Sequence, residues 1–314
     1  MTLFNKIKNT FRIKYNVYKN NNYVVVIYML HRCSPMDNEK LSNTESLKVS
    51  PEYLKSFLIE TQKTHDIISL DDLYSITINK KKANRKLAIF TFDDGYLDNY
   101  YNAKPIFEKL NLPYAIFVTN CFPNNKGVLW WFLIEDLLLS NNSIVLSDNK
   151  VFDCSTKELK EHVFENLKST IFSLNQLNLS KEIMLLFKNY KVDIESYNRK
   201  YCMNWEQIIE LSNSNLCTIG SHTNSHLTLN KLTTEELKRE VLKGKKTLEN
   251  KINQRVKHFA YPFGSPREVG LREKNFLATC GFDTVSMAVG GTINNFKTLN
   301  LKDLKREMLF NSEL

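Results

Sequence analysis

Short apolar runs recur along this sequence, and most are followed by a segment in which apolar residues have the spacing of a helix. These runs are residues 23–30, 86–92, 113–119, 216–221, 256–261 and 284–289. Repeated strand-then-helix units build a parallel sheet, because each helix returns the chain to the same edge of the sheet. The pattern predicts an α/β fold, and the number of units suits a (β/α) barrel.

This rhythm is interrupted between about residues 121 and 201. The segment 130–139 has a strongly helical pattern, 143–154 has that of a small hairpin, and two amphipathic helices are expected after it. We interpret residues 121–201 as a mostly helical insertion that covers one side of a cleft. The alternation then resumes, and the capping pattern Thr233-x-x-Glu236 predicts a long helix that ends near residue 253.

Charge and apolar runs limit where the chain works and what it binds. The formal charge is +9, but basic residues are spread along the whole chain without a nucleic-acid-binding motif, so we expect no nucleic acid partner. The longest apolar run, 24–30, is far shorter than the roughly 20 residues of a membrane helix. With no signal-peptide cleavage pattern either, a cytoplasmic location is expected.

We divide the chain into a basic segment, 1–22, and one domain, 23–314. Residues 4–14 have the pattern of a short basic amphipathic helix, which predicts either peripheral contact with a membrane or packing on the domain. The six cysteines include no Cys-x-x-Cys pair, so reduced thiols are expected rather than a thiolate metal site.

Two adjacent carboxylates, Asp93 and Asp94, follow a buried strand. Because side chains alternate along a strand, we expect the two to point in different directions and to do different jobs. A helix cap followed by a first-turn acid is the structural alternative, and it accounts for one Asp better than for two.

Two histidines, His222 and His226, follow another predicted strand. A spacing of four lets both imidazoles face one point, and neutral imidazoles suit zinc and similar ions. By itself this pair is weak evidence. With an Asp from another strand end it becomes two nitrogens and one oxygen around a metal with an open position, as in catalytic zinc sites. The neighbouring Asp is then placed to accept a proton from water.

Three ordered motifs resemble one known family. They are Thr91-Phe92-Asp93-Asp94-Gly95, Ser221-His222-Thr223-Asn224-Ser225-His226 and Phe259-Ala260-Tyr261-Pro262-Phe263-Gly264. The set is similar to the first three motifs of the polysaccharide deacetylases, carbohydrate esterase family four, also described as the NodB-homology domain. The likeness extends to 49–73, to the Trp130-Trp131 helix, to 203–206 and to 304–306, and so covers most of the chain from Tyr23 onward.

This resemblance implies a distorted, incomplete (β/α) barrel with one divalent metal ion, zinc being our expectation, at the open face of the strands. It implies that Asp94, His222 and His226 hold the metal and that Asp93 is the general base. The backbone N–H of Phe263 would help to hold the oxyanion. We assign Tyr261 to the substrate-binding group with Phe263, and the aromatic residues Trp130 and Trp131 to the recognition of sugar rings.

The sequence departs from the family pattern in two places. Where many members have an Arg in the third motif that orients the base, this chain has Ala260, and Arg306 is our candidate replacement, with a surface role as the alternative. Members also usually have a late histidine as the general acid, and none follows His258 here. We predict that His31, at the end of the first strand, lies across the metal from Asp93 and protonates the leaving nitrogen. His258 is the other option.

The predicted activity is hydrolysis of an N-acetyl or other N-acyl group on an amino sugar of a glycan or of a lipid-linked or nucleotide-linked precursor. N-deformylation or O-deacetylation of a sugar is an alternative that the same metal centre supports. A glycan-binding protein that keeps the fold without turnover is the alternative from another class. The missing late histidine and Ala260 favour it, and the intact pairs of aspartates and histidines argue against it.

Overall fold

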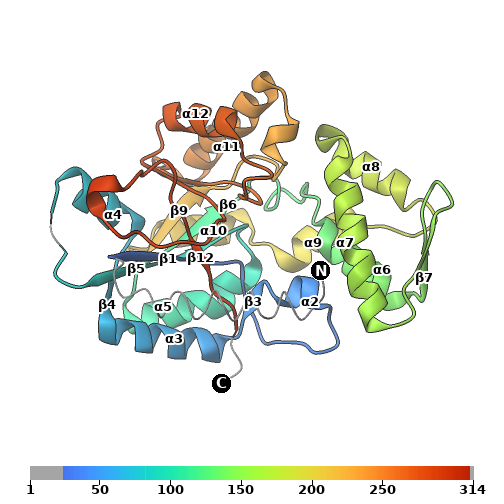
Figure 1. Ribbon diagram of the computed structural model, residues 1–314, viewed down its shortest axis with the longest axis horizontal. Coiled ribbons are helices and arrows are strands. Elements are labelled where there is room, and N and C mark those ends of the chain that lie inside the picture. The colour runs from blue at the N-terminus through green and yellow to red at the C-terminus, as the bar shows by residue number, and fades with distance from the viewer. Residues whose placement is uncertain (1–23, 82, 312–314) are drawn as a thin grey trace.

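A single parallel sheet forms the centre of the molecule in the computed structural model, which describes residues 24–81 and 83–311 (Figure 1). The basic segment 1–22, with its predicted membrane contact, lies outside the described residues. Neighbouring strands follow the order β11-β10-β9-β6-β5-β1-β12, and β4 pairs with the start of β5. The strands are β1 (Val25–Leu30), β4 (His65–Ile67), β5 (Lys86–Phe92), β6 (Tyr114–Val118), β9 (Cys217–Ser221), β10 (His258–Ala260), β11 (Thr284–Ser286) and β12 (Glu307–Met308).

The sheet curves into a barrel that is closed irregularly. Leu304, which precedes β12, forms a parallel β-bridge with Ser286 of β11, and β12 itself pairs with β1. The N–H of Arg306 donates to the carbonyl of Val289, so residues of the last segment span the gap that a further strand would fill. The predicted distorted, incomplete (β/α) barrel is therefore confirmed.

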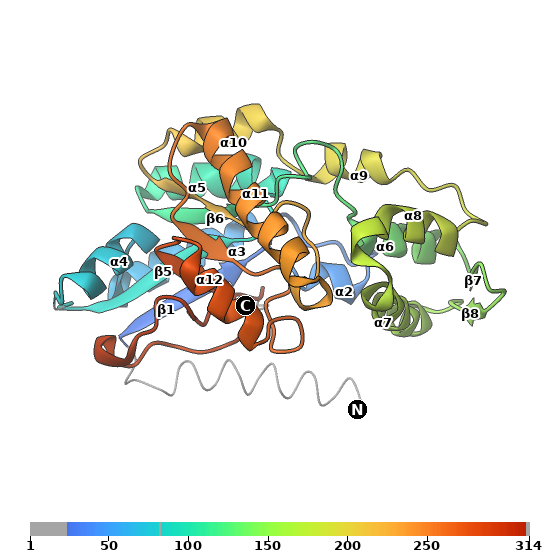
Figure 2. The ribbon, with the colours of Figure 1, turned by 90° about the horizontal axis from the view of Figure 1, so that it is seen from above.

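Helices cover the outer face of the barrel (Figure 2). They are α3 (Pro51–Thr64), α4 (Leu70–Ile78), α5 (Lys104–Leu110), α10 (Trp205–Ser212), α11 (Thr234–Ile252) and α12 (Leu271–Thr279). A π-helical turn, Asn99–Ala103, precedes α5, and short pairs β2 (Arg32–Cys33) and β3 (Lys48–Val49) flank a single turn, α2 (Ser42–Glu45). The predicted capping box is present at α11, where the hydroxyl of Thr233 accepts from the N–H of Glu236.

Alternation along β5 separates an outer core from an inner one. Ala88, Phe90 and Phe92 face the helices, while Leu87 and Ile89 belong to a smaller cluster inside the barrel. Leu70 and Leu73 of α4 join this inner cluster and close the amino end of the barrel. Thr91 and Asp93 continue the inner face toward the carboxyl end, where apolar filling gives way to polar groups.

Between β6 and α10 the chain leaves the barrel and forms a lobe with its own apolar core (Figures 1 and 2). Its elements are α6 (Trp130–Ser140), β7 (Ser143–Val145), β8 (Val151–Asp153), α7 (Lys157–Ser173), α8 (Leu179–Leu186) and α9 (Ile194–Tyr201). The predicted hairpin is confirmed as β7 and β8. Three α-helices follow it rather than two, because residues 187–193 form a non-helical connection between α8 and α9.

Within the described residues, no helix combines the length and the apolar character needed to cross a bilayer. The six cysteines are free thiols, as predicted, and five of them are buried.

Candidate metal and catalytic site

One cavity of about 720 Å³ opens at the carboxyl ends of the strands. Every predicted site residue except Arg306 lines it: His31, Asp93, Asp94, Trp130, Trp131, His222, His226, Tyr261 and Phe263. The barrel supplies its floor, and the lobe supplies one wall through α6 and α7. A cavity of this size and mixed lining is typical of small-molecule and sugar sites.

Three ligand atoms converge at the floor of this cavity. The Nε2 atoms of His226 and His222 lie 3.0 and 3.4 Å from Oδ1 of Asp94. All three side chains offer a ligand atom within 4.8 Å of the others. Oδ1 of Asp94 is buried and has no hydrogen-bond partner. An acceptor oxygen buried without a donor is costly, and a cation held between it and two imidazoles removes that cost, so the residues fit a divalent metal ion.

The imidazole of His222 is fixed in the form that a metal requires. Its Nδ1 lies 2.8 Å from the carbonyl oxygen of Ala260, and because a carbonyl only accepts, Nδ1 carries the hydrogen. Nε2 then faces Asp94 and can serve as a metal ligand. Burial alone raises the pKa of Asp94, but the positive charge of His226 and His222, when these imidazoles are protonated, outweighs burial and holds that pKa well below its ordinary value.

The second carboxylate, Asp93, is held by Arg306. The guanidinium Nη1 and Nη2 atoms donate to the two Asp93 oxygens at 2.7 and 2.8 Å. Nη1 also donates to the hydroxyl of Thr91 and Nε to the carbonyl of Met287. Arg306 is completely buried, so the alternative of a surface role is wrong. Burial alone raises the pKa of Asp93, and Arg306 brings it below the ordinary value, which keeps the carboxylate ionised.

Asp93 and Asp94 both line the cavity but face different groups: Arg306 holds Asp93, and the two histidines lie against Asp94. Asp94 has a left-handed backbone, with φ of 74°. Thr223, His226 and Phe263 are left-handed too, with φ of 69°, 56° and 60°. Such conformations in residues other than glycine are strained and gather at functional sites.

His31 lies in the cavity and not behind the sheet. Its Nδ1 is buried without a hydrogen-bond partner, so this atom is not engaged by backbone at the strand end. Burial lowers the pKa of His31, while Asp94 and Asp93 oppose that shift. His258, the other option, starts β10 and lies in the core, with Nδ1 2.9 Å from the hydroxyl of Thr284.

The aromatic residues at the site are largely buried. Trp130 and Trp131 have only 5% and 7% of their surfaces accessible, because α6 is apolar on nearly all sides and forms the core of the lobe. Both line the cavity, and Nε1 of Trp131 is buried without a partner. Tyr261 lines the cavity too, while its ring packs on Phe259 in the outer core.

Sequence reasoning missed three contributors to the site. Thr91 positions Arg306, and its place two residues before Asp93 on the same face of β5 is a signal that alternation offers. The Ala260 carbonyl orients His222, which no side-chain pattern reveals. Tyr96 lines the cavity with a buried hydroxyl that has no partner.

Comparisons with known proteins agree with this architecture. The family model for polysaccharide deacetylases matches residues 156–281, which contain both histidines and the third motif but not Asp93 and Asp94. YxkH of Bacillus subtilis, which is provisionally named a polysaccharide deacetylase, is 23% identical to this chain over 192 residues. That match spans 61% of this chain but only 42% of YxkH, so the chain corresponds to less than half of that relative.

Solved structures share the fold along nearly the whole chain. The Streptococcus pyogenes deacetylase PplD, in complex with acetate, superposes with a TM-score of 0.59 at 16% identity, over 91% of this chain and 92% of PplD. IcaB from Ammonifex degensii gives 0.55 at 16% identity, with 91% and 92% coverage. A polysaccharide deacetylase from Bacillus cereus gives 0.57 at 15% identity, covering 92% of this chain and 66% of its own. The predicted resemblance is confirmed as a similarity: residues 156–281 match the polysaccharide deacetylase family model, and the fold is shared with solved polysaccharide deacetylases.

Proposed function

We propose that this protein is a metal-dependent hydrolase that removes an N-acetyl group from an amino sugar of a glycan or glycan precursor. The observation that carries the proposal is the convergence of Asp94, His222 and His226 on one point beside a second buried carboxylate, Asp93. Family kinship supports a sugar deacetylase in general. The pairing of three ligand atoms with a separate, clamped carboxylate favours hydrolysis assisted by a metal.

Asp94, His222 and His226 would hold the ion, and zinc is the proposed metal because two imidazoles and one carboxylate suit it. When bound, the ion supplies Lewis-acid activation of a water molecule and of the acyl oxygen. Asp93 accepts the proton that this water loses as its oxygen bonds to the acyl carbon. Arg306 occupies only two of the carboxylate's roughly four lone-pair positions, so Asp93 keeps acceptor capacity toward the cavity.

The carbon–nitrogen bond then breaks, and the departing nitrogen takes a proton to leave as an amine. We assign that donation to His31, because it lines the cavity near Asp93 and Asp94 and its Nδ1 has no other partner. The two carboxylates favour a proton on His31, while burial disfavours it. The Phe263 N–H is the proposed backbone donor to the acyl oxygen, and the products are acetate and an amino sugar.

The sugar would lie between the barrel and the lobe. Trp130 and Trp131 line the cavity there, and the unpartnered Nε1 of Trp131 would offer a donor for a sugar hydroxyl. A lipid-linked or nucleotide-linked precursor, handled in the cytoplasm as an early step of glycan biosynthesis, remains the proposed substrate class beside a finished glycan. N-deformylation and O-deacetylation would use the same groups.

Acetate release from N-acetylated sugars by metal-loaded protein tests the proposal. Wild type should release acetate and bind about one zinc ion per chain. His226→Ala should lose both, while Asp93→Asn should keep the metal and lose activity by a factor on the order of 10²–10⁴, because an amide cannot accept the proton. Formate release instead of acetate would favour deformylation. Sugar binding without any product would favour the non-catalytic alternative and refute the proposal.

A further inference from the structure

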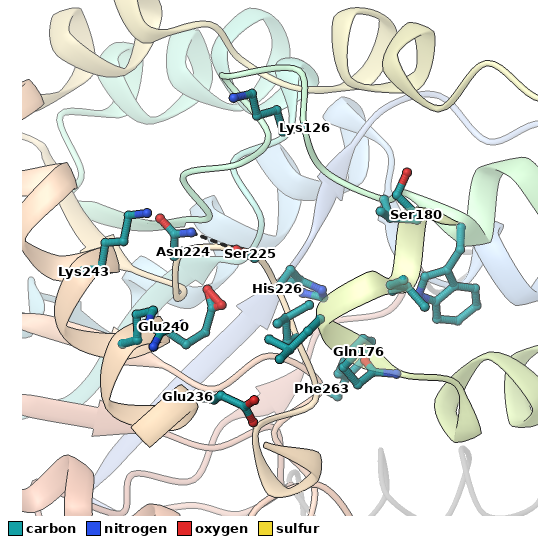
Figure 3. A pocket seen from close by; sticks show the side chains of 16 residues that line it. Lys126, Gln176, Ser180, Asn224, Ser225, His226, Glu236, Glu240, Lys243 and Phe263 are labelled. Atoms are coloured by element: carbon teal, nitrogen blue, oxygen red, sulfur yellow. Dashed lines mark hydrogen bonds between the residues drawn. The ribbon is translucent and has the colours of Figure 1, made fainter. Parts of the chain in front are cut away.

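A second cavity, of about 280 Å³, shares His226 with the cavity of the metal site, and Figure 3 shows the side chains that line it. Trp130, His226 and Phe263 line both cavities and form the boundary between them. One wall comes from α11 of the barrel, and the other comes from the lobe at the start of α8. A ligand that occupies both cavities would therefore lie against these three side chains.

The α11 wall presents a buried acceptor without a donor. Glu240 is only 7% exposed, and its Oε1 atom has no hydrogen-bond partner. Figure 3 shows Glu240 next to Asn224 and Ser225, with Glu236 one helical turn away along the same wall. A buried carboxylate oxygen left without a donor is expensive unless a ligand supplies one. Ser225 and Asn224 already donate to the Glu240 carboxylate, so Oε1 is the oxygen that remains available to accept a hydrogen bond from a ligand.

The lobe wall combines amide, hydroxyl and apolar groups. Gln176 and Ser180 face the cavity from the side opposite Glu240 (Figure 3), and Leu177, Leu179 and Trp130 add apolar surface. The Gln176 amide already donates to the carbonyls of Ile171 and Leu174, so a pyranose ring would meet the available carboxylate oxygen of Glu240 and the apolar and aromatic surface of the lobe.

We propose that this second cavity binds a sugar unit that neighbours the N-acetylated sugar in the same glycan. The identity of the ligand rests on the proposed function, which places the acetylated sugar in the first cavity. The cations Lys126, Arg239 and Lys243 are exposed at the rim, and Glu236 and Glu240 offset most of their charge. A hydroxyl-rich sugar therefore fits this cavity better than a phosphate, which would be repelled by the two carboxylates.

Two cavity-filling substitutions, one from each wall, test this proposal. Ser180→Trp enters from the lobe and Lys243→Trp from α11, and both positions are exposed, so folding should tolerate them. The matched controls are Lys181→Trp and Lys246→Trp, exposed neighbours on the same two helices that line neither cavity. Thermal melting of all four variants shows whether each one folds.

The probes are N-acetylglucosamine and its soluble β-1,4-linked and β-1,6-linked tetramers. Binding is measured by calorimetry in a His222→Ala background, so that no turnover disturbs it. Ser180→Trp and Lys243→Trp should each weaken the affinity for whichever tetramer binds on the order of tenfold more than they weaken the affinity for the monomer. The two control variants should change neither affinity. In the active protein, the ratio of tetramer to monomer kcat/KM should fall by a similar factor.

The proposal is overturned if the tetramer binds no more tightly than the monomer. It is also overturned if neither Ser180→Trp nor Lys243→Trp weakens tetramer binding. Binding of inorganic pyrophosphate that Lys243→Trp abolishes, with tetramer binding unchanged, identifies an anion site and also overturns it. Tetramer binding that depends on both walls, without acetate release by wild type, refutes the proposed hydrolysis and leaves the sugar site standing. Acetate release by wild type, with tetramer binding unaffected by Ser180→Trp and Lys243→Trp, supports the proposed hydrolysis and refutes the second sugar site.

Discussion

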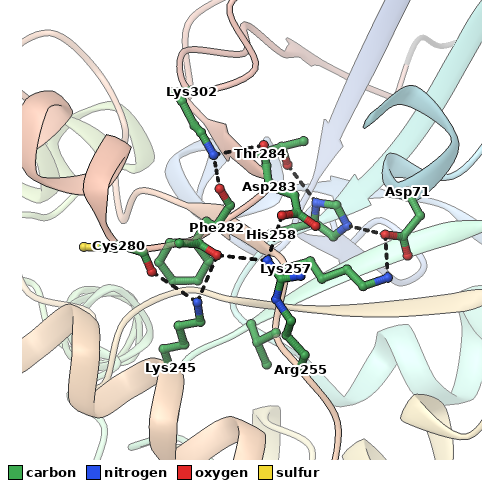
Figure 4. Close-up of polar contacts among 12 residues, drawn as sticks. Asp71, Lys245, Arg255, Lys257, His258, Cys280, Phe282, Asp283, Thr284 and Lys302 are labelled. Atoms are coloured by element: carbon green, nitrogen blue, oxygen red, sulfur yellow. Dashed lines mark hydrogen bonds and ion pairs between the residues drawn. The ribbon is translucent and has the colours of Figure 1, made fainter. Parts of the chain in front are cut away.

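Both ends of the barrel contain histidines and aspartates, but their polar atoms have hydrogen-bond partners at the amino end and several lack partners at the carboxyl end. At the amino end, His258 lies between Thr284 and Asp71, with its Nε2 3.4 Å from Oδ1 of the aspartate (Figure 4). Arg255 pairs with Asp283 at 2.9 Å nearby. At the carboxyl end, histidines and aspartates also meet, but Asp94 Oδ1, His31 Nδ1 and the Tyr96 hydroxyl are buried without partners.

This contrast separates structural histidines from functional ones. Each ring nitrogen of His258 already has a partner within the protein, so binding a ligand would first break these contacts. The unpartnered atoms at the other end impose a cost that only a ligand removes. In (β/α) barrels generally, function lies at the carboxyl ends of the strands and stability at the amino ends, and the hydrogen bonds here follow that division.

The largest expected effect on turnover comes from a comparison of two variants, each with one histidine substituted at one end of the barrel. His31→Gln should keep the metal but lower turnover by a factor on the order of 10²–10⁴, the usual worth of a general acid. His258→Gln should leave turnover nearly intact and lower the melting temperature, because it disturbs buried contacts with Thr284 and Asp71. Initial rates, metal content and melting curves of both variants make the test. Near-normal turnover in His31→Gln would move the search for the acid to a water molecule.

A smaller effect is expected where Arg306 holds the general base. Arg306→Lys replaces a two-pronged contact by a single donor, so rates should fall about 10–100-fold, the equivalent of one hydrogen bond to a charged group. The pKa of Asp93, now held below its ordinary value, should rise. Since Asp93 must be ionised to act, the acid limb of the kcat/KM profile should move to higher pH. An unmoved limb would mean that Arg306 only supports the fold.

Periodicity predicted the strands well because the barrel buries them on both faces. The runs 86–92 and 216–221 match β5 and β9 to within a residue. Short elements escaped prediction: β4 and β12 have three and two residues, and their place depends on pairing with β5 and β1 rather than on their own composition. Propensity carries little information over so few residues.

The sequence could predict those parts of the site that consist of side chains with distinctive chemistry, such as adjacent carboxylates and paired histidines. Asp94, His222 and His226 meet as expected, because parallel strands bring their carboxyl ends together. The left-handed backbone of Asp94 could not be foreseen, because the strand pattern gives no signal for it. The sequence could not decide whether Trp130 faces solvent or core, because that depends on how α6 packs against α7.

A tenfold effect on metal affinity should follow from crowding the histidine loop. Gly244 lies within α11, and a Cβ there would come 2.8 Å from the Asn224 nitrogen and 2.9 Å from the Thr223 carbonyl carbon. Gly244→Ala gains helix propensity of about 1 kcal/mol, but the backbone between the two histidines must move. Zinc affinity should fall about tenfold, the size of an outer-shell change, whereas Lys246→Ala should change nothing. Wild-type affinity in Gly244→Ala would show that the loop shifts without moving its ligands.

The smallest effect is expected at the amino end, where partners are already satisfied. Asp71 lies 2.9 Å from the Lys257 amine, and contacts with His258 and Lys257 hold its pKa below the ordinary value. A lowered folded-state pKa means that Asp71 stabilises the protein above the unfolded pKa, near 4, and that this contribution disappears as the pH falls further. Its side chain is 42% exposed, so solvent screening limits the loss in Asp71→Asn to less than about 1 kcal/mol at neutral pH. Denaturant titrations should show that loss shrinking below pH 4, with metal content and turnover unchanged, and Asp66→Asn, which removes an exposed pair with Arg85, serves as the control. A loss of activity in Asp71→Asn would contradict the division of labour between the two ends of the barrel.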